Sequence, residues 1–274
     1  MKHRNLTTAA TQRAFTLVEL VVVIIILGIL GGLSAGILLQ PFRAFEDQAR
    51  RAELVAEADL ALTRMVRELR MALPNSVRIA GGGSYLEFIP TTDGGRYRAL
   101  PDPADPASDP LDFAAADSSF DVLGGLAAGA APGDQLVIYN ATASGPAANA
   151  YIGDNRAPIA AFAGGTMSLS TARLFPFPSL GAQRFDVVPA SGPVSYFCAD
   201  GQLRRHTGYG FSPAQPAGFG SSDGALLADR VSLCQFTYQP GDHVRNGLVT
   251  LRLGLTAEGE SINLLYQAQV VNAP

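Results

Sequence analysis

Hydrophobic positions along the chain fall into three consecutive patterns. Residues 15 to 39 are almost entirely apolar and carry one charge, Glu19. From residue 42 to 73, apolar residues recur every three or four positions with charged residues between them, which is the pattern of an amphipathic helix. After Pro74, apolar and polar residues alternate, as is typical of β-strands. The pattern therefore predicts one long helix followed by a strand-rich body.

The apolar run is long enough to cross a membrane. Its 25 residues would make a helix of roughly 37 Å at about 1.5 Å per residue, which exceeds the thickness of the hydrocarbon core. Lys2, Arg4 and Arg13 precede the run, and only Arg43 follows it before the first acids. This bias predicts an amino terminus in the cytoplasm and a body on the other side of the membrane.

The helix pattern continues past the apolar run to Pro74-Asn75, where proline and the following turn residue predict its end. Gly31, Gly32, Gly36 and Pro41 lie between its two halves. Proline costs about 3 kcal/mol inside a helix and each glycine up to about 1 kcal/mol, so we expect a kink or a locally melted stretch here. The alternative is that the glycines line a helix-packing face.

The body is predicted to be an antiparallel sheet. Two joints, Asp200-Gly201 and residues 257 to 260, indicate hairpins. A long helix laid on one face of such a sheet would bury both apolar surfaces, which predicts an α+β fold. The expected strands are residues 77–80, 85–89, 135–140, 167–175, 184–189, 194–199, 202–206, 231–239, 248–256 and 261–271.

Two cysteines, Cys198 and Cys234, lie in predicted strands 36 positions apart. They have no CxxC spacing and no clustered histidines, so a zinc site is not indicated. We expect a disulfide between them, in an oxidising compartment, with two separate buried thiols as the alternative.

Composition argues against several function classes. The net charge of −4 does not suit a nucleic-acid binder. His206 and His243 have no recognisable nucleophile or triad beside them, and the glycines at 81 to 83 lack the pattern of a phosphate loop. We therefore expect no enzymatic activity and no catalytic residue.

One loop could hold a cation. The segment PDPADPASDPLD contains Asp102, Asp105, Asp109 and Asp112 among prolines, and loop carboxylates can bind Ca²⁺. It lacks the glycine turn and distal glutamate of an EF-hand loop, and proline-acid runs are usually solvated. We accordingly expect no cofactor, with calcium as the alternative.

Glu19 requires an explanation, because an isolated acid in hydrocarbon costs about 2.5 to 3.5 kcal/mol on insertion scales. A secretory signal cleaved near Ser34-Ala35-Gly36 would have a shorter apolar core. A plain uncleaved anchor would leave the acid unpaired.

The sequence Ala14-Phe15-Thr16-Leu17-Val18-Glu19 resembles the class III signal of type IV prepilins and type II secretion pseudopilins, G-F-T-L-x-E. The resemblance implies cleavage between Ala14 and Phe15 by a membrane prepilin peptidase that also methylates the new amine of Phe15. It further implies that Glu19 pairs with the terminal amine of a neighbouring subunit during assembly. Alanine stands where the family usually has glycine.

This resemblance implies four segments: a cleaved leader (1–14), a transmembrane and filament-core helix (15–40), its amphipathic continuation (41–74) and a β-rich body (75–274). The expected partners are other pilins, the prepilin peptidase, the inner-membrane assembly platform and the membrane. The expected location is the inner membrane with a periplasmic body, and then the pilus surface.

The segment ALTRMVRELRMALPNSVRI and the large body with two late cysteines resemble the minor pilins of the mannose-sensitive-haemagglutinin (MSHA) type of pilus, in particular the MshO family. This implies a low-abundance subunit that initiates or caps a fibre used in adhesion or motility. The alternatives are a minor pseudopilin of type II secretion and a signal-anchored envelope enzyme or binding protein.

Overall fold

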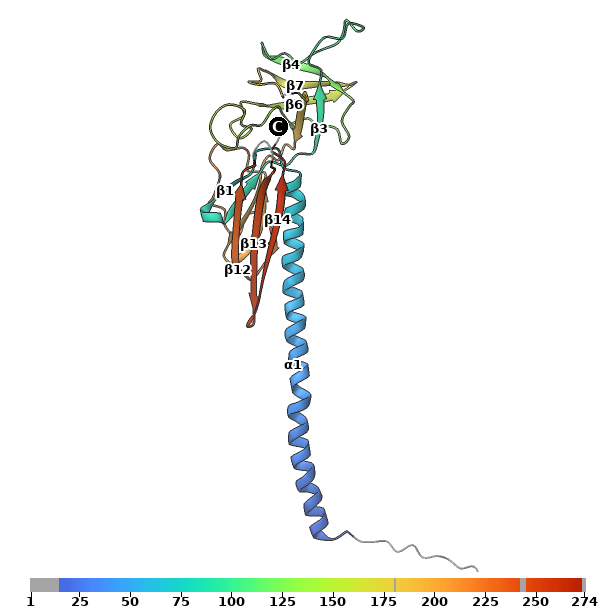
Figure 1. Cartoon of the computed structure of the whole chain (residues 1–274), viewed down its shortest axis with the longest axis vertical. Coiled ribbons are helices and arrows are strands. Elements are labelled where there is room, and N and C mark those ends of the chain that lie inside the picture. Colours follow the sequence, from blue (N-terminus) through green and yellow to red (C-terminus); the bar gives the residue numbers. More distant parts are fainter. Residues whose placement is uncertain (1–14, 180, 242–244, 273–274) are drawn as a thin grey trace, which may run out of the picture. The chain divides into compact units, whose positions relative to one another are not determined.

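A computed structural model describes residues 15–179, 181–241 and 245–272. Internal contacts divide the chain into two units, Met1–Arg50 and Arg51–Pro274. A single helix, α1 (Leu17–Arg70), contributes residues to both units, and all the strands belong to the second (Figure 1). The helix ends three residues before the predicted limit. Its last turn tightens, since the amides of Met71 and Ala72 donate to the carbonyls three residues earlier.

The strands form two antiparallel sheets and one closed barrel. The five-stranded sheet has the order β1-β2-β9-β10-β11, and the three-stranded sheet has the order β12-β13-β14. The barrel has the order β3-β4-β7-β6-β5-β8. The bounds are β1 Arg78–Ala80, β2 Tyr85–Phe88, β3 Asp93–Tyr97, β4 Asp117–Leu123, β5 Gln135–Val137, β6 Arg156–Ala163, β7 Thr166–Arg173, β8 Arg184–Val188, β9 Val194–Ala199, β10 Gln202–Thr207, β11 Ala225–Ala228, β12 Val231–Gln239, β13 Gly247–Ala257 and β14 Glu260–Val270, with a short 3₁₀ helix, η1, at Gly81–Gly83.

The second half of α1 shares one hydrophobic core with both sheets. Its inward residues follow steps of three and four positions and are Leu54, Ala58, Ala61, Leu62, Met65 and Leu69. From β13, Val249, Leu251, Leu253 and Leu255 meet them, because alternate residues of a strand point to the same face. In Figure 1 this part of α1 runs beside β12, β13 and β14. The α+β class predicted from the sequence is confirmed.

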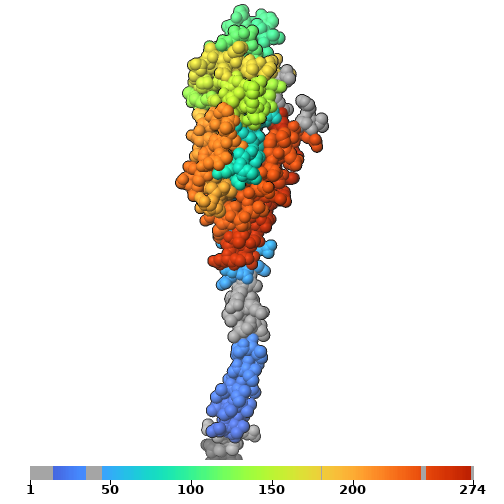
Figure 2. All heavy atoms as spheres, turned by 90° about the vertical axis from the view of Figure 1, so that its left-hand side faces the viewer, coloured from blue at the N-terminus to red at the C-terminus, as the bar shows by residue number. Residues whose placement is uncertain are grey.

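The barrel has a core of its own. Phe120 of β4 and Phe185 of β8 meet edge to face at 5.6 Å, and Leu136, Ile159 and Met167 surround them. In Figure 2 the green and yellow atoms of this region form one end of the body, and the orange and red strands form the other. The sequence predicts a single sheet, so the barrel is a difference between expectation and structure.

The difference arises at strands whose sequences do not look like strands. β3 has the sequence DGGRY, which is typical of a turn, and β6 has proline and four alanines in RAPIAAFA. The sequence does not predict β4 and β11 either. Barrel closure supplies hydrogen-bond partners on both sides of β3, β4 and β6, so pairing outweighs weak local propensity there, whereas β11 pairs with β10 at the edge of the five-stranded sheet.

Both predicted hairpins are confirmed. Asp200 and Gly201 join β9 to β10 with φ of 50° and 72°, and Glu258 and Gly259 join β13 to β14 with φ of 47° and 87°. Two successive positive φ values give the type I′ turn that suits the twist of antiparallel strands.

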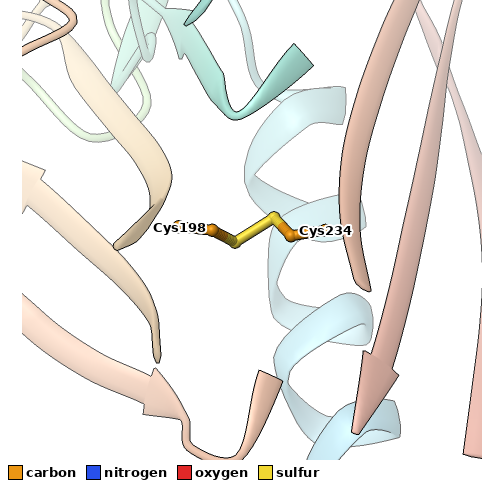
Figure 3. Close-up of a disulfide and its surroundings, with 2 residues drawn as sticks. All are labelled: Cys198 and Cys234. Atoms are coloured by element: carbon orange, nitrogen blue, oxygen red, sulfur yellow. A yellow bond between two sulfur atoms is a disulfide. The ribbon is translucent and has the colours of Figure 1, made fainter. Parts of the chain in front are cut away.

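A disulfide joins the two sheets. Cys198 of β9 lies in the five-stranded sheet and Cys234 of β12 lies in the three-stranded sheet, and their Cα atoms are 6.4 Å apart. Figure 3 shows the bridge crossing between the strands in front of the helix. The cross-link therefore fastens the two sheets beside the helix that they share.

Candidate assembly segment

The first turn of α1 brings the predicted processing and assembly residues together. Phe15 and Thr16 precede the helix, and the hydroxyl of Thr16 accepts a hydrogen bond from the amide of Glu19 at 3.3 Å. The carbonyl of Thr16 accepts from the amide of Leu20 at 3.2 Å, so Thr16 is the N-cap and Glu19 lies three residues after it. A carboxylate in this turn also interacts favourably with the positive end of the helix dipole. Ala14 lies outside the described residues.

The helix that follows is apolar on every side. Leu17–Ser34 has a mean hydropathy of 2.7 and none of it is buried within the protein, so it is long and apolar enough to cross a membrane. The large apolar side chains between Phe15 and Leu33 are each at least 43% exposed. A helix that is hydrophobic all round needs lipid or other protein around it. Glu19 is the one ionisable residue of this span.

Packing among the described residues does not require glycine at positions 28, 31 and 32 of this helix. A Cβ atom added at Gly28, Gly31 or Gly32 would meet nothing within 4 Å. Residues three and four positions apart share one helix face, so these glycines leave a shallow strip along α1. This supports the alternative of a helix-packing face.

The sequence also predicts a kink or a locally melted stretch in α1 near residues 31 to 41. Residues 31 to 41, which include Gly36 and Pro41, are helical without a break in the structure. The locally melted form of the prediction is therefore not seen, and the kink stays a prediction.

Ion pairs fasten the second half of α1 to the sheets. Glu68 accepts from Arg205 of β10 at 2.9 Å and from Arg64 at 3.0 Å, and Glu57 accepts from Arg230 at 2.7 Å. Burial by itself raises the pKa of Glu68, but the hydrogen bonds from Arg205 and Arg64 outweigh it and lower the pKa below its usual value. These pairs fix the rotation of the helix on its shared core.

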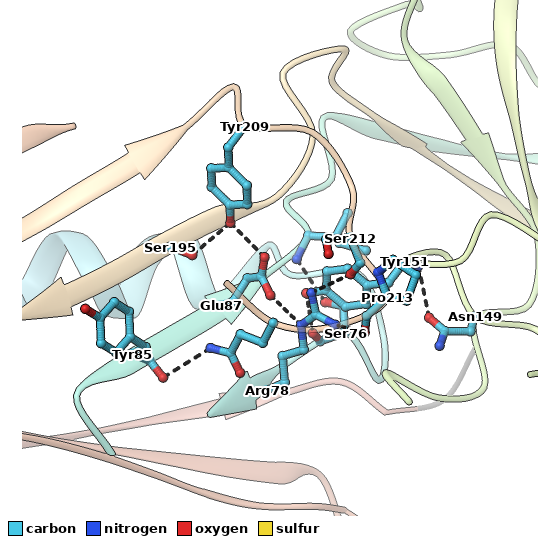
Figure 4. A network of polar contacts seen from close by, with 12 residues as sticks. Ser76, Arg78, Tyr85, Glu87, Asn149, Tyr151, Ser195, Tyr209, Ser212 and Pro213 are labelled. Atoms are coloured by element: carbon cyan, nitrogen blue, oxygen red, sulfur yellow. Dashed lines mark hydrogen bonds and ion pairs between the residues drawn. The ribbon is translucent and has the colours of Figure 1, made fainter. Parts of the chain in front are cut away.

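A second polar cluster is buried inside the body (Figure 4). Glu87 of β2 is fully buried and pairs with Arg78 of β1, and it accepts a hydrogen bond from Tyr209 at 2.8 Å. Arg78 also donates to the carbonyls of Ser212 and Pro213 at 2.8 and 2.9 Å. Burial raises the pKa of Glu87, although Arg78 and Tyr209 oppose the increase.

This cluster connects three parts of the body. The guanidinium of Arg78 lies 3.5 Å from the ring centroid of Tyr151, and the hydroxyl of Tyr151 donates to the carbonyl of Ser76 at 2.8 Å. Tyr151 belongs to the segment between barrel strands β5 and β6, and Tyr209 to the loop after β10. The cluster therefore ties the barrel and this loop to the five-stranded sheet.

Three of the four loop aspartates that could bind calcium accept backbone hydrogen bonds that close turns. Asp102, Asp105 and Asp112 each accept a hydrogen bond from the amide two residues ahead, and Asp109 accepts from the hydroxyl of Ser119 at 2.6 Å. Among the described residues, no three His, Cys, Asp or Glu side chains gather as they would around a metal ion. Whether this loop takes up calcium stays a prediction.

His206, which the sequence gives no catalytic setting, packs among aromatic side chains. The ring of His206 stacks on Tyr209 at 5.2 Å and meets Phe219 edge to face at 4.6 Å. His243 lies outside the described residues.

Sequence reasoning did not find the Arg78–Glu87 cluster. Tyr151 and Tyr209 are far from Arg78 and Glu87 in the chain, and the one local signal is a charged residue inside the apolar strand YLEF. Register brings the pair together, since Arg78 lies directly opposite Glu87.

Comparison with known families gives one match. Residues 10–35 match the family described as the prokaryotic N-terminal methylation motif. No curated protein and no solved structure matches the chain. The matched residues contain the whole Ala14-to-Glu19 pattern and the apolar helix to Ala35, so they support a class III signal of the pilin and pseudopilin kind.

Proposed function

We propose that this chain is a minor type IV pilin of the MSHA type, a low-abundance subunit that initiates or caps a fibre used in adhesion or motility. The observation that carries the proposal is an apolar helix against which no other described part of the chain packs. It contains one acid, Glu19, four residues after Phe15. A subunit that moves from lipid into a filament core would keep its apolar helix covered in both places.

The methylated amine of Phe15 would supply the charge that Glu19 lacks. Phe15 and Glu19 lie one turn apart at the start of α1. Two such helices that pack with an axial offset would place the amine of one beside the carboxylate of the other. A buried carboxylate is tolerated when a cation accompanies it, so the pairing would favour assembly over the isolated subunit.

The size of the body supports a terminal place in the fibre. Residues 75–274 contain two sheets and a barrel, which makes a large unit to repeat in a tightly packed shaft. The prepilin peptidase and an inner-membrane assembly platform are the partners that this role requires. In this proposal the body is periplasmic before assembly and at the cell surface afterwards.

Mass spectrometry of the mature protein tests the processing step. We expect residues 1 to 14 to be absent and Phe15 to carry one methyl group. Replacement of Phe15 by alanine serves as a comparison, because it changes the methylated residue and leaves the apolar span intact. An intact Met1, or a cut near Gly36, would contradict the proposal and favour a signal-anchored envelope protein or a secretory one.

The matched motif supports a minor pseudopilin of type II secretion equally well. Cell-surface labelling separates the two functions. A body that an externally added antibody reaches on intact cells supports a pilin, whereas one reached only after the outer membrane is opened supports a pseudopilin.

A further inference from the structure

Two arginines lie opposite each other on the outer face of the barrel. Arg96 of β3 is the cross-strand neighbour of Arg184 of β8. The amide of Tyr97 donates to the carbonyl of Gln183 at 2.9 Å. Arg96 and Arg184 are therefore a non-hydrogen-bonded pair of the antiparallel ladder. Side chains are closest in pairs of this kind, with Cα atoms about 4.5 Å apart. Both arginines are exposed, since Tyr97 and Phe185 beside them take the inward positions.

Neither arginine has a partner that would neutralise it directly. Within the described residues, neither guanidinium makes a hydrogen bond or an ion pair within 4 Å, although Arg184 interacts electrostatically with Asp186 on the same strand. Like charges directly opposite each other destabilise a sheet. The free protein therefore bears a cost at this position that an anionic ligand would remove.

A hollow of about 510 Å³ lies beside the pair. Besides the two arginines, the described residues that line it are all very small: Gly94, Gly95, Gly181 and Ala182. Its volume falls within the range of about 300 to 1,000 Å³ that is usual for small-molecule sites.

Packing keeps the floor of the hollow free of side chains. A Cβ atom at Gly95 would lie 2.6 Å from the ring of Phe185, and one at Gly94 would lie 3.1 Å from the carbonyl of Phe185. Gly181 has a φ of 76°, which side chains disfavour. A side chain at Gly94 or Gly181 would therefore be strained on the outer face, and one at Gly95 would clash with Phe185 inside the barrel, so small residues are favoured beside the hollow.

An acceptor lies next to the arginines. Asp186 follows Arg184 by two residues on the same face of β8, and its cross-strand neighbour is Gly94. A Cβ atom at Gly94 would lie 3.5 Å from a carboxylate oxygen of Asp186. Burial raises the pKa of Asp186 to about 6, although Arg184 opposes the increase. Its carboxylate makes no hydrogen bond with any described residue.

We propose that this hollow binds an acidic saccharide, with Arg96 and Arg184 holding the sugar carboxylate and Asp186 accepting a hydrogen bond from a neighbouring hydroxyl. Guanidinium groups present paired donors whose geometry matches a carboxylate. A bare phosphate or sulfate ion would fit the arginines but would be repelled by Asp186. A sugar acid offers both a carboxylate and hydroxyl donors, so it satisfies all three side chains. This proposal does not depend on the pilin function.

Calorimetry on the purified full-length chain in non-ionic detergent tests the proposal. The probes are trigalacturonate, the neutral trigalactose and inorganic phosphate. We expect binding of trigalacturonate, no binding of trigalactose and weaker binding of phosphate. Arg96→Gln and Arg184→Gln should each weaken trigalacturonate binding about tenfold or more, because each removes a guanidinium group with its charge and paired donors. Asp186→Asn should weaken binding of the saccharide but not of phosphate.

Arg252→Gln is the matched control, since Arg252 is exposed on β13, away from the barrel strands. It should bind trigalacturonate as the wild type does. Arg96→Lys tests the fork itself, because it keeps the charge, and it should bind between wild type and Arg96→Gln. Arg96→Gln should also unfold at a slightly higher temperature than wild type in the absence of ligand, because it removes a like-charge pair.

Three results would overturn the proposal. The first is a wild-type chain that does not bind trigalacturonate. The second is a folded Arg96→Gln/Arg184→Gln variant that binds it unchanged. The third is phosphate binding as tight as trigalacturonate binding together with no effect of Asp186→Asn, which would indicate a simple anion site instead of a saccharide site.

Discussion

A carboxylate that is removed from water costs free energy unless a cation or a hydrogen-bond donor accompanies it, and fully buried Glu87 and half-buried Asp186 show the two situations. Glu87 has Arg78 and Tyr209 as donors. Asp186 has no hydrogen bond within the described residues, and only Arg184 interacts with it electrostatically. We therefore expect the chain to lose stability when Arg78 is removed from Glu87, and to gain stability when the charge of Asp186 is removed.

Arg78→Met should destabilise the body strongly. It leaves Glu87 buried without its cation, which typically costs about 3 to 5 kcal/mol. Urea unfolding followed by the near-ultraviolet circular dichroism of the tyrosines measures the change. The double variant Arg78→Met/Glu87→Gln should recover part of the loss, because no buried charge remains. An unchanged midpoint in the single variant would contradict the role given to this pair.

Asp186 should make stability depend on pH. Its pKa is about 6 in the folded chain against an ordinary value of 3.8, so the folded state binds more protons between these pH values. Stability therefore falls as the pH rises from about 4 to about 6 and stays lower above this range. Asp186→Asn should remove this dependence and stabilise the chain at pH 7 by about 1 to 3 kcal/mol, with little effect below pH 4. Unfolding curves of the wild type and Asp186→Asn at pH 4 and pH 7 test this prediction. An equal change in stability at both pH values would contradict the raised pKa of Asp186.

At the scale of elements, the second half of α1 is held by one buried stripe. Leu62 is fully buried between the sheets, whereas Leu60, two positions earlier on the same helix, is 71% exposed. The two leucines have the same chemistry and the same helix propensity. They therefore isolate the contribution of burial.

Leu62→Ala should cost about 2 to 5 kcal/mol of unfolding free energy, because it leaves a cavity in the shared core. Leu60→Ala should change stability by about 0.5 kcal/mol or less. Urea unfolding of both variants gives the comparison. Equal losses would mean that the helix does not pack on the sheets as described.

The disulfide joins β9 to β12 and so stabilises the two sheets against which the helix packs. The bridge between Cys198 and Cys234 closes a loop of 36 residues, which corresponds to about 3 to 4 kcal/mol in the chain-entropy model. We expect a reducing agent to lower the unfolding midpoint of the wild type and to leave that of Cys198→Ala/Cys234→Ala unchanged. A wild-type midpoint that is insensitive to complete reduction would contradict the stabilising role.

At the scale of the whole molecule, the apolar helix and the body differ in how much apolar surface they bury within the chain. All the hydrophobic clusters of the body lie within Arg51–Pro274, whereas Leu17–Ser34 buries nothing within the chain. The body therefore buries its apolar side chains by its own packing. The first segment depends on what surrounds it.

Glu19→Gln should prevent assembly and leave membrane insertion intact. The amide lacks the charge to pair with a terminal amine, and a neutral residue enters lipid more easily than an acid. Pili sheared from cells and probed for the subunit measure assembly, and membrane fractionation measures insertion. Glu19→Asp is the control that keeps the charge, and it should assemble in part. Normal incorporation of the Gln variant would remove the basis of the pilin proposal.

Local pattern predicts those features of the chain that depend on near neighbours. The long helix follows from apolar steps of three and four residues, and the turn at Glu258-Gly259 follows from alternating strands around a short polar joint. The sequence around Phe15 and Glu19 likewise identifies a methylation motif without any fold. In each case the physical signal lies within a few residues of the feature.

Only the tertiary structure decided the barrel and the contacts built on it. The strand DGGRY has weak propensity and becomes a strand because β4 and β8 pair with its two edges. Register then sets Arg96 opposite Arg184 over a separation of 88 residues, and the fold brings Tyr209 to Glu87 over a separation of 122 residues. Such juxtapositions depend on how distant segments close against each other, and local periodicity carries no information about that closure.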